Sequence, residues 1–377
     1  MSEYQYYEFA AIDRPLTEKE MDELGELSSR AEITPTSFTN VYHFGNFRGN
    51  PRKMMEKYFD FFVYVANWGT YHTMIRVPKW ALDRKQLKPY IDGEVVSLHE
   101  AGDNLIVEFV AQEEPGDWVE GAACLPSLRP VRDALLAGDL RPFYLGWLRA
   151  VVQGSVDDEE VEPPVPPGLG KLSPALQSLA DFLVIGIDLI AAAAEGNQET
   201  AAPAGSSQRD FAAWTAALGD RDKNAWLLEL LLGDGAKARS EALKAFHESK
   251  AKAPAAGARS FKQPGRTVAE LLATAERLRE ARLAHERQRA EKAKADARKK
   301  HLDALADREA AAWKEVDALL SASTAKKHAT AMTLLNDLRD VAARRGRIDE
   351  AQQRIEHYRR RFARRHSLMR RFRDAGL

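Results

Sequence analysis

The sequence is poor in cysteine, because Cys124 is the only one among 377 residues. A single cysteine excludes an internal disulfide and any zinc site built from several cysteines. No apolar run approaches the roughly 20 residues that a membrane helix needs. The first 20 residues also carry no basic region followed by an apolar block, as a secretory signal would. We therefore expect a cytoplasmic protein with no membrane span.

Signatures of known catalytic centres are absent as well. Residues 168–173, GLGKLS, partly match a phosphate-binding loop, but Val165 replaces its first glycine and Leu172 replaces its hydroxyl residue. Three His-Glu pairs lack the second histidine of a zinc metalloprotease; they begin at His99, His247 and His285. No G-x-S-x-G nucleophile motif occurs. The sequence therefore predicts no metal and no cofactor, and it leaves any catalytic residue unknown.

Charge is nearly balanced over the whole chain but not along it. Lysine and arginine number 55 against 56 aspartates and glutamates, a net charge of −1. Residues 254–377 hold 30 basic and 17 acidic side chains, a net charge of +13, whereas residues 1–253 hold 25 and 39, a net charge of −14. This division favours an anionic partner for the basic part. The alternative is that the basic part docks on the acidic part of the same chain.

Residues 1–155 alternate between segments typical of strands and of helices. The segments expected as strands, which are rich in aromatic and β-branched residues, are 4–12, 62–69, 71–78 and the two arms of a hairpin around 101–104. A capping box of Thr17 and Glu20 predicts the start of one helix, and Pro51 predicts the start of another. This order predicts an α+β domain, either ferredoxin-like or a related α/β sandwich.

Two segments of loose composition divide the rest of the chain. Residues 156–170 combine an acidic run with several prolines and predict a stiff linker, and residues 251–266 predict a second linker. Between them, the periodicity of residues 171–250 predicts a helical domain. Residues 267–377 are expected to form an all-α region with a long basic helix and a C-terminal helical hairpin.

The long helix has an unusual middle. It is expected to begin near Thr267, since no glycine or proline follows for more than fifty residues. Between Arg282 and Lys300 almost no apolar residue is larger than alanine, which predicts a solvent-exposed rod or a weakly packed coiled coil. The hairpin is expected to turn at Arg345 and Gly346, and it resembles one tetratricopeptide-like repeat.

Polar residues near the ends of neighbouring predicted strands are the best candidates for a ligand site. They are Asn40, His43, Asn67, His72 and Arg76. Histidine, asparagine and arginine side chains that converge at a loop edge would suit an enzyme or a binding site. In the alternative interpretation, nearby aromatic residues fill the core and the histidines only cap strand ends.

The C-terminal segment is rich in arginine. Residues 354–373 hold nine arginines and one acid, Glu356, and an apolar stripe runs along one helical face at Ile355, Tyr358, Phe362, Met369 and Phe372. The planar guanidinium fork suits phosphate and carboxylate. Residues predicted to bind nucleic acid or an acidic protein partner are Arg359, Arg360, Arg361, Arg364, Arg365, Arg370, Arg371 and Arg373. Docking within the chain and an anionic membrane surface are the alternatives.

Four segments resemble a family of bacterial proteins described only as hypothetical. They are RAEITPTSFTN (30–40), YVANWGT (64–70), EPPVPPGLGKLS (162–173) and SLMRRFRDAGL (367–377). The resemblance extends over nearly the whole chain and brings no activity and no catalytic residues. It implies a shared complex with a SWIM-type zinc-finger protein.

These observations favour a non-enzymatic adaptor protein whose basic C-terminal arm contacts nucleic acid or an acidic protein. An enzyme that uses the strand-edge cluster is the first alternative. The second is a structural subunit that forms a homo-oligomer through the charged helix, residues 267–320.

Overall fold

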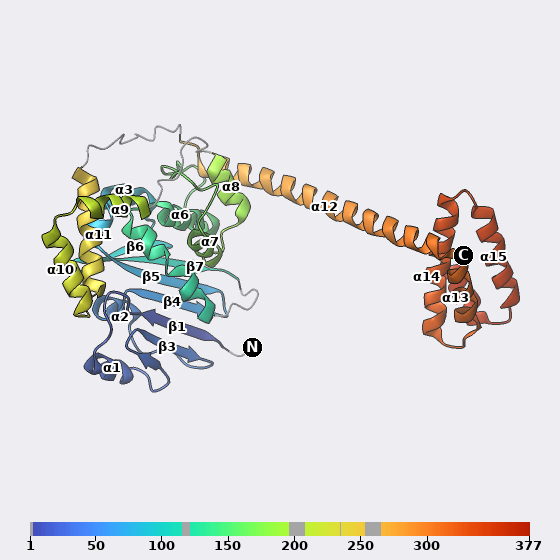
Figure 1. The fold of residues 1–377 in the computed structure, drawn as a ribbon, viewed down its shortest axis with the longest axis horizontal. Helices are drawn as coiled ribbons and strands as arrows, with labels where there is room; N and C mark the ends of the chain where they lie inside the picture. Colours follow the sequence, from blue (N-terminus) through green and yellow to red (C-terminus); the bar gives the residue numbers. More distant parts are fainter. Residues whose placement is uncertain (1–2, 115–120, 196–207, 234, 253–264) are drawn as a thin grey trace. The chain divides into compact units, whose positions relative to one another are not determined.

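The computed structural model describes residues 3–114, 121–195, 208–233, 235–252 and 265–377. Contacts divide the chain into two units, Met1–Arg279 and Glu280–Leu377. The first unit contains a β-sheet with helices, and the second contains helices alone (Figure 1). This organisation confirms the predicted α+β class with an all-α continuation.

A seven-stranded sheet is the centre of the first unit. Its strands are β1 (Gln5–Ala10), β2 (Glu32–Thr34), β3 (Ser37–Tyr42), β4 (Phe61–Ala66), β5 (Thr70–Pro78), β6 (Val96–Ala101) and β7 (Asn104–Gln112). Their spatial order is β2-β3-β1-β4-β5-β7-β6, and every pairing is antiparallel. Seven strands exceed the four of a β-α-β-β-α-β unit. The fold is therefore a related α/β sandwich.

Helices pack on both faces of this sheet, because successive side chains of a strand point to opposite sides. Val63 and Ile75 face α4 (Cys124–Leu128), α5 (Val131–Leu136), α6 (Arg141–Gln153), α7 (Pro174–Phe182) and α8 (Ile187–Glu195). Phe62 and Met74 face α1 (Glu18–Gly25) and α2 (Pro51–Lys57). In Figure 1, α6 lies by β6 and β7, and α7 lies by α6. The short α3 (Arg84–Leu87) connects β5 to β6.

The segment predicted as a linker, 156–170, packs into the first unit instead. Val165 and Leu169 are buried in the same core as the sheet. Glu162 is buried and pairs with Arg266, whose Nε lies 2.5 Å from its Oε2. Helices α7 and α8 share this core as well, so they do not form a separate domain. Acidic and proline-rich composition predicts a stiff backbone, but it does not show where the few apolar side chains dock.

Three further helices belong to the first unit, α9 (Gln208–Ala217), α10 (Asp220–Leu231) and α11 (Gly235–Lys252). The rings of Trp214 and Trp226 stack with centroids 5.8 Å apart and so join α9 to α10. Leu243 of α11 packs against the core of the sheet. Arg239 pairs with Asp133 of α5 at 2.8 Å. These contacts attach the helices to the sheet.

The long helix ends earlier than the sequence predicts. It is α12 (Val268–Asp307), and Arg308 then leaves helical geometry, with φ −115° and ψ 22°, before α13 (Glu309–Ser321) begins. The side chains at 284–301 are exposed in the single chain, as both predicted forms of this stretch, the rod and the weakly packed coiled coil, require. No described helix is both long and apolar enough to cross a bilayer.

The second unit also contains α14 (Ala325–Arg344), α15 (Ile348–Arg361) and α16 (His366–Asp374). The predicted hairpin of α14 and α15 is confirmed, and Gly346 adopts φ +68° at its turn. Helices α12 to α16 share one apolar core, which includes Trp313, Leu335, Phe362 and Phe372. The predicted apolar stripe of the tail thus faces the inside of its own unit.

Candidate functional site

A buried carboxylate, Glu108, organises a polar cluster on the face of the sheet that also holds α1 and α2. In the register of the sheet, Glu108 of β7 lies opposite Met74 of β5 and Ser97 of β6. Because side chains alternate, His72 and His99 lie on the same face, two residues from these partners. The Nε2 atoms of His72 and His99 each lie 2.7 Å from a different Glu108 oxygen.

Two more groups hold this carboxylate. Ser97 donates its hydroxyl to Glu108 Oε2 at 3.0 Å, and Arg52 of α2 donates from Nη2 at 2.9 Å. Only 9% of the Glu108 side chain is exposed. Burial raises the pKa of Glu108, but the adjacent His72, the charge of Arg52 and the Ser97 hydroxyl outweigh it and hold this pKa far below the usual range. Glu108 is therefore a buried, ionised carboxylate at neutral pH.

A cavity of about 700 Å³ opens beside this cluster. It is lined by Arg48, Gly49, Asn50, Pro51, Arg52, Lys53, Glu56, His72, Met74 and Glu108. Arg48 and Lys53 are exposed there, and no ion pair joins either of them to another described residue. Even without His72, the cations of Arg48, Arg52 and Lys53 outnumber the carboxylates of Glu56 and Glu108, so the lining carries a net positive charge. The cavity can therefore attract a small anion and place it beside a histidine that contacts a carboxylate.

The other predicted ligand residues do not join His72. Asn40 is buried on β3, where its amide donates to the Ser28 hydroxyl at 2.8 Å and to the Tyr42 hydroxyl at 3.1 Å. His43 is exposed at the end of β3, and its ring centroid lies 6.0 Å from that of Tyr4. The side-chain oxygen of Asn67 accepts a hydrogen bond from the backbone of Tyr4 at 3.0 Å. His43 and Asn67 thus lie near the start of β1, apart from the cavity lining.

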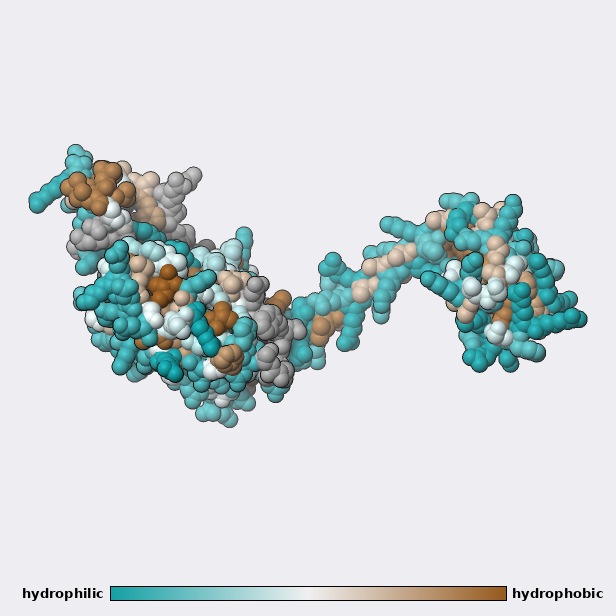
Figure 2. Space-filling view, turned by 90° about the horizontal axis from the view of Figure 1, so that it is seen from below, coloured by the Kyte–Doolittle hydropathy of each residue, from teal (hydrophilic) through white to brown (hydrophobic). Residues whose placement is uncertain are grey.

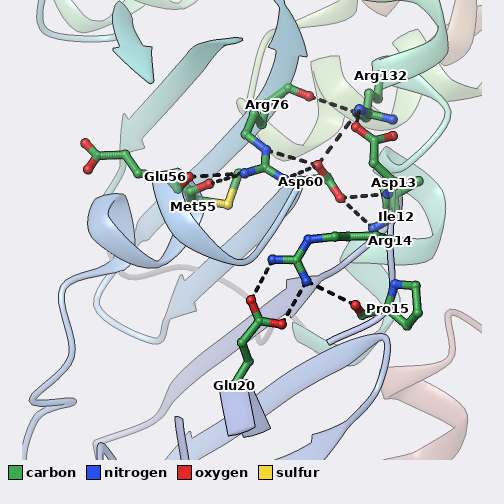
Figure 3. A network of polar contacts seen from close by, with 10 residues as sticks. All are labelled: Ile12, Asp13, Arg14, Pro15, Glu20, Met55, Glu56, Asp60, Arg76 and Arg132. Atoms are coloured by element: carbon green, nitrogen blue, oxygen red, sulfur yellow. Dashed lines mark hydrogen bonds and ion pairs between the residues drawn. The ribbon is translucent and has the colours of Figure 1, made fainter. Parts of the chain in front are cut away.

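Arg76 belongs to a buried ionic network around Asp60 (Figure 3). Its Nε and Nη2 atoms donate to Asp60 Oδ1 at 3.0 and 2.7 Å. The other Asp60 oxygen accepts from the backbone of Ile12 and Asp13 at 2.6 and 2.8 Å. Burial raises the pKa of Asp60, but the charges of Arg76 and Arg132 outweigh it and lower this pKa. These contacts join β1, β4 and β5, and they assign Arg76 a structural role.

Sequence reasoning missed four members of the cluster, Glu108, Ser97, His99 and Arg52. One signal was available, since Glu108 is a charged residue inside the apolar strand sequence NLIVEFVA, where a half-buried strand favours apolar side chains. The pairing of β7 with both β5 and β6 could not be foreseen from that signal. Without this pairing, His72 and His99 have no common partner.

The arginine-rich segment forms a second candidate surface. Arg361 pairs with Asp317 at 2.5 Å, and Arg359 and Arg360 approach Glu356 at 3.5 and 3.4 Å. Arg365 donates to the backbone oxygen of Leu320 at 2.9 Å. Arg370 lies 4.0 Å from Asp374, whereas Arg364, Arg371 and Arg373 form no ion pair with any described residue. We call these eight side chains the arginine surface.

This surface is part of a folded unit rather than of a free arm. The backbone of Arg365 is not helical, with φ −94° and ψ 85°, so the predicted single amphipathic helix is divided into α15 and α16. Asn336 and Arg339 of α14 donate to the backbone oxygens of Ala375 and Gly376 at 3.3 and 2.7 Å. Residues 375 and 376 are therefore held on α14, and the arginines project from helices that share one apolar core.

Comparison with protein-family models, with curated proteins and with solved structures gives no match to this chain. Among the described residues, no group of three or more histidine, cysteine, aspartate or glutamate side chains is arranged to hold a metal ion. A proposal about function therefore rests on the geometry of the two candidate sites.

Proposed function

We propose that this chain is an interaction protein. Its second unit binds nucleic acid, and the arginine surface contacts the phosphates of the nucleic-acid backbone. The observation that carries the proposal is that Arg364, Arg371 and Arg373 form no ion pair with any described residue and project from helices that share one apolar core. Residues 280–377 contain 25 basic and 15 acidic side chains, so the unit as a whole attracts anions. Phosphate suits this surface because the guanidinium fork binds it with two hydrogen bonds.

The paired arginines of this surface remain available to phosphate. The side chains of Arg360 and Arg370 are 80% and 79% exposed, and their carboxylate partners lie at 3.4 and 4.0 Å. Exposed ion pairs of this kind contribute little to stability. A phosphate can therefore replace the carboxylate at small cost, and the released Glu356 remains hydrated. Because these contacts involve only the phosphates of the nucleic acid and not its bases, we expect little preference for a base sequence.

The salt dependence of binding tests this proposal. Binding of the full chain to a 20-base-pair duplex is measured by fluorescence anisotropy at several salt concentrations. Each phosphate contact contributes a slope of about −0.9 to log K against log salt. The triple variant Arg364→Gln, Arg371→Gln, Arg373→Gln should therefore bind more weakly and show a slope shallower by about 2 to 3.

A matched control removes three charges from the first unit. Lys19, Lys85 and Lys88 are exposed there without ion pairs to described residues, and their replacement by glutamine should leave the slope unchanged. Equal slopes for both triple variants would contradict the proposal. Binding to poly-glutamate but not to the duplex would assign the surface to an acidic protein instead. A complex with a SWIM-type zinc-finger protein stays a prediction.

The cavity beside Glu108 favours a second candidate function, the binding of a small anion next to an acid–base pair. Arg48 and Lys53 would neutralise the anion, while Glu108 holds His72 and Arg52 in position. Titration calorimetry with inorganic phosphate should give at least tenfold weaker binding for Arg48→Gln, Lys53→Gln than for the wild type. Glu23→Gln, which lies outside the cavity on α1, serves as a control. Equal affinity of the double variant and the wild type would exclude this function.

A further inference from the structure

The most exposed apolar surface in the described part of the chain lies on α10 and the residue after it. Leu227, Leu228, Leu230, Leu231 and Leu232 are all between 57% and 80% exposed. In Figure 2, apolar side chains gather at the left end of the first unit, the end at which α10 lies in Figure 1. Single exposed leucines are ordinary on protein surfaces, but a contiguous group of five is not.

The leucines occupy a wide arc of the helix. Trp226 faces inward, where its ring stacks on that of Trp214. At 100° per residue, Leu227, Leu231, Leu228 and Leu232 then follow one another over about 140° of the opposite side, and Leu230 lies about 60° outside this arc, toward Trp226. None of these leucines belongs to the apolar cores of the first unit. They do not contribute to these cores and remain available for contact with another molecule.

A shallow groove lies directly beside the leucines. Its volume is about 390 Å³, and its apolar lining includes Trp214, Leu218, Trp226, Ala238 and Ala242. Leu227 and Leu230 are themselves part of this lining. Protruding leucines and a receiving apolar groove therefore lie side by side on one surface. Two copies related by a twofold axis can each place a leucine in the groove of the other, as an isologous interface requires.

We infer that α10 is the interface of a homodimer. The five leucines expose on the order of 500 Å² of surface, so two copies would bury on the order of 1,000 Å² before the groove is added. With the groove, this area approaches the roughly 1,200 Å² at which specific interfaces begin. A second copy fits better than an unrelated protein, because it brings a groove and leucines of matching size.

Charge on the same helix is compatible with self-association. The first turn of α10 carries Asp220, Arg221, Asp222 and Lys223, and therefore no net charge. Asp220 and Lys223 lie 3.9 Å apart within this turn. The remaining charged residue of α10 is Glu229, so each helix carries a net charge of −1 and two of them repel each other only weakly. The exposed stretch of α12 at 284–301 lacks large apolar side chains, so the structure favours α10 over the charged helix as the site of oligomerisation.

The oligomeric state of the full chain tests the inference. Sedimentation velocity should show a dimer of the wild type at micromolar concentrations. The variant Leu228→Gln, Leu231→Gln, Leu232→Gln should sediment as a monomer. Since these side chains are already exposed, circular dichroism and the melting temperature should stay unchanged. A control that removes three exposed apolar residues elsewhere, Val152→Gln, Ile187→Gln, Leu272→Gln, should remain dimeric.

A cross-linking variant locates the interface independently. Cys124 is replaced by serine, and Leu231→Cys or, as control, Leu272→Cys is introduced. Under mild oxidation Leu231→Cys should form a disulfide-linked dimer and Leu272→Cys should not. A wild type that is monomeric up to about 100 μM would overturn the inference. So would a dimer that survives the triple leucine substitution.

Discussion

Substitution of Asp60 should destabilise the first unit more than most single changes. Only 1% of its side chain is exposed, and it accepts hydrogen bonds from Arg76 and from the backbone of Ile12 and Asp13. Asp60→Ala leaves the Arg76 guanidinium, which is 13% exposed, without its carboxylate. Breaking one partner of a buried pair costs about 3–5 kcal/mol. The two backbone N–H groups are only half-buried, so they add about 1 kcal/mol together.

The expected total of about 4–6 kcal/mol is close to the whole stability of many domains. Asp60→Asn is the more informative variant, because its side-chain oxygen can still accept from the backbone of Ile12 or Asp13. It loses mainly the charge opposite Arg76, and we expect about 2–3 kcal/mol. In a double-mutant cycle with Arg76→Gln, the two substitutions should not be additive, with a coupling of about 1–3 kcal/mol.

Urea unfolding followed by tryptophan fluorescence measures these free energies. The buried Trp147 reports on the first unit. Hydrogen exchange of β4 and β5 assigns the transition to that unit. Glu100 lies in an exposed pair with Lys79 and Arg84, so Glu100→Gln is the matched control and should change stability far less.

The pH dependence supplies a second check with a definite sign. Because the folded state lowers the pKa of Asp60, its contribution is complete above about pH 4, the unfolded value, and is lost as the pH falls through the folded value. The difference between wild type and Asp60→Asn should therefore shrink below about pH 4. A loss under 1 kcal/mol at pH 7, or a difference that grows on acidification, would refute the structural role of this network.

Three further predictions follow from packing and exposure. Gly146 of α6 lies so close to β6 and β7 that an added Cβ would overlap Val96 and Phe109, so Gly146→Ala should destabilise the first unit by about 1–3 kcal/mol in urea unfolding, and an unchanged midpoint would contradict this packing. Partial burial raises the pKa of the Cys124 thiol to about 11, so its reaction with Ellman's reagent at pH 8 should be slower in the folded protein than in urea, and equal rates would contradict this partial burial. Amides at 284–300 should exchange faster than those of α14, since no apolar packing protects them; the reverse order by mass spectrometry would contradict their exposure.

Local patterns in the sequence were sufficient to predict several helix starts and turns of the fold. The capping box of Thr17 and Glu20 is present at the start of α1, and Pro51 is the first residue of α2. The turn at Gly346 separates α14 and α15 as predicted. A left-handed backbone conformation favours glycine, so the local sequence is sufficient to place this turn. The exposure of the α12 stretch at 284–301 could also be predicted from the sequence, since a segment without large apolar residues has no apolar surface to bury.

Beyond the hairpin of β6 and β7, which the sequence predicted, tertiary structure decided which residues became neighbours. The antiparallel pairing of β7 with β5 and β6 placed His72 and His99 on Glu108, and the approach of α2 added Arg52. Asp60 forms an ion pair with Arg76, which the sequence pattern had placed in the ligand site. Likewise, the division of charge between residues 1–253 and 254–377 could be counted in the sequence, but the carboxylate partner of each arginine could not be predicted from it. Helix and strand periodicity depends on a few adjacent residues, whereas strand order and ion pairing depend on contacts between segments far apart in the chain.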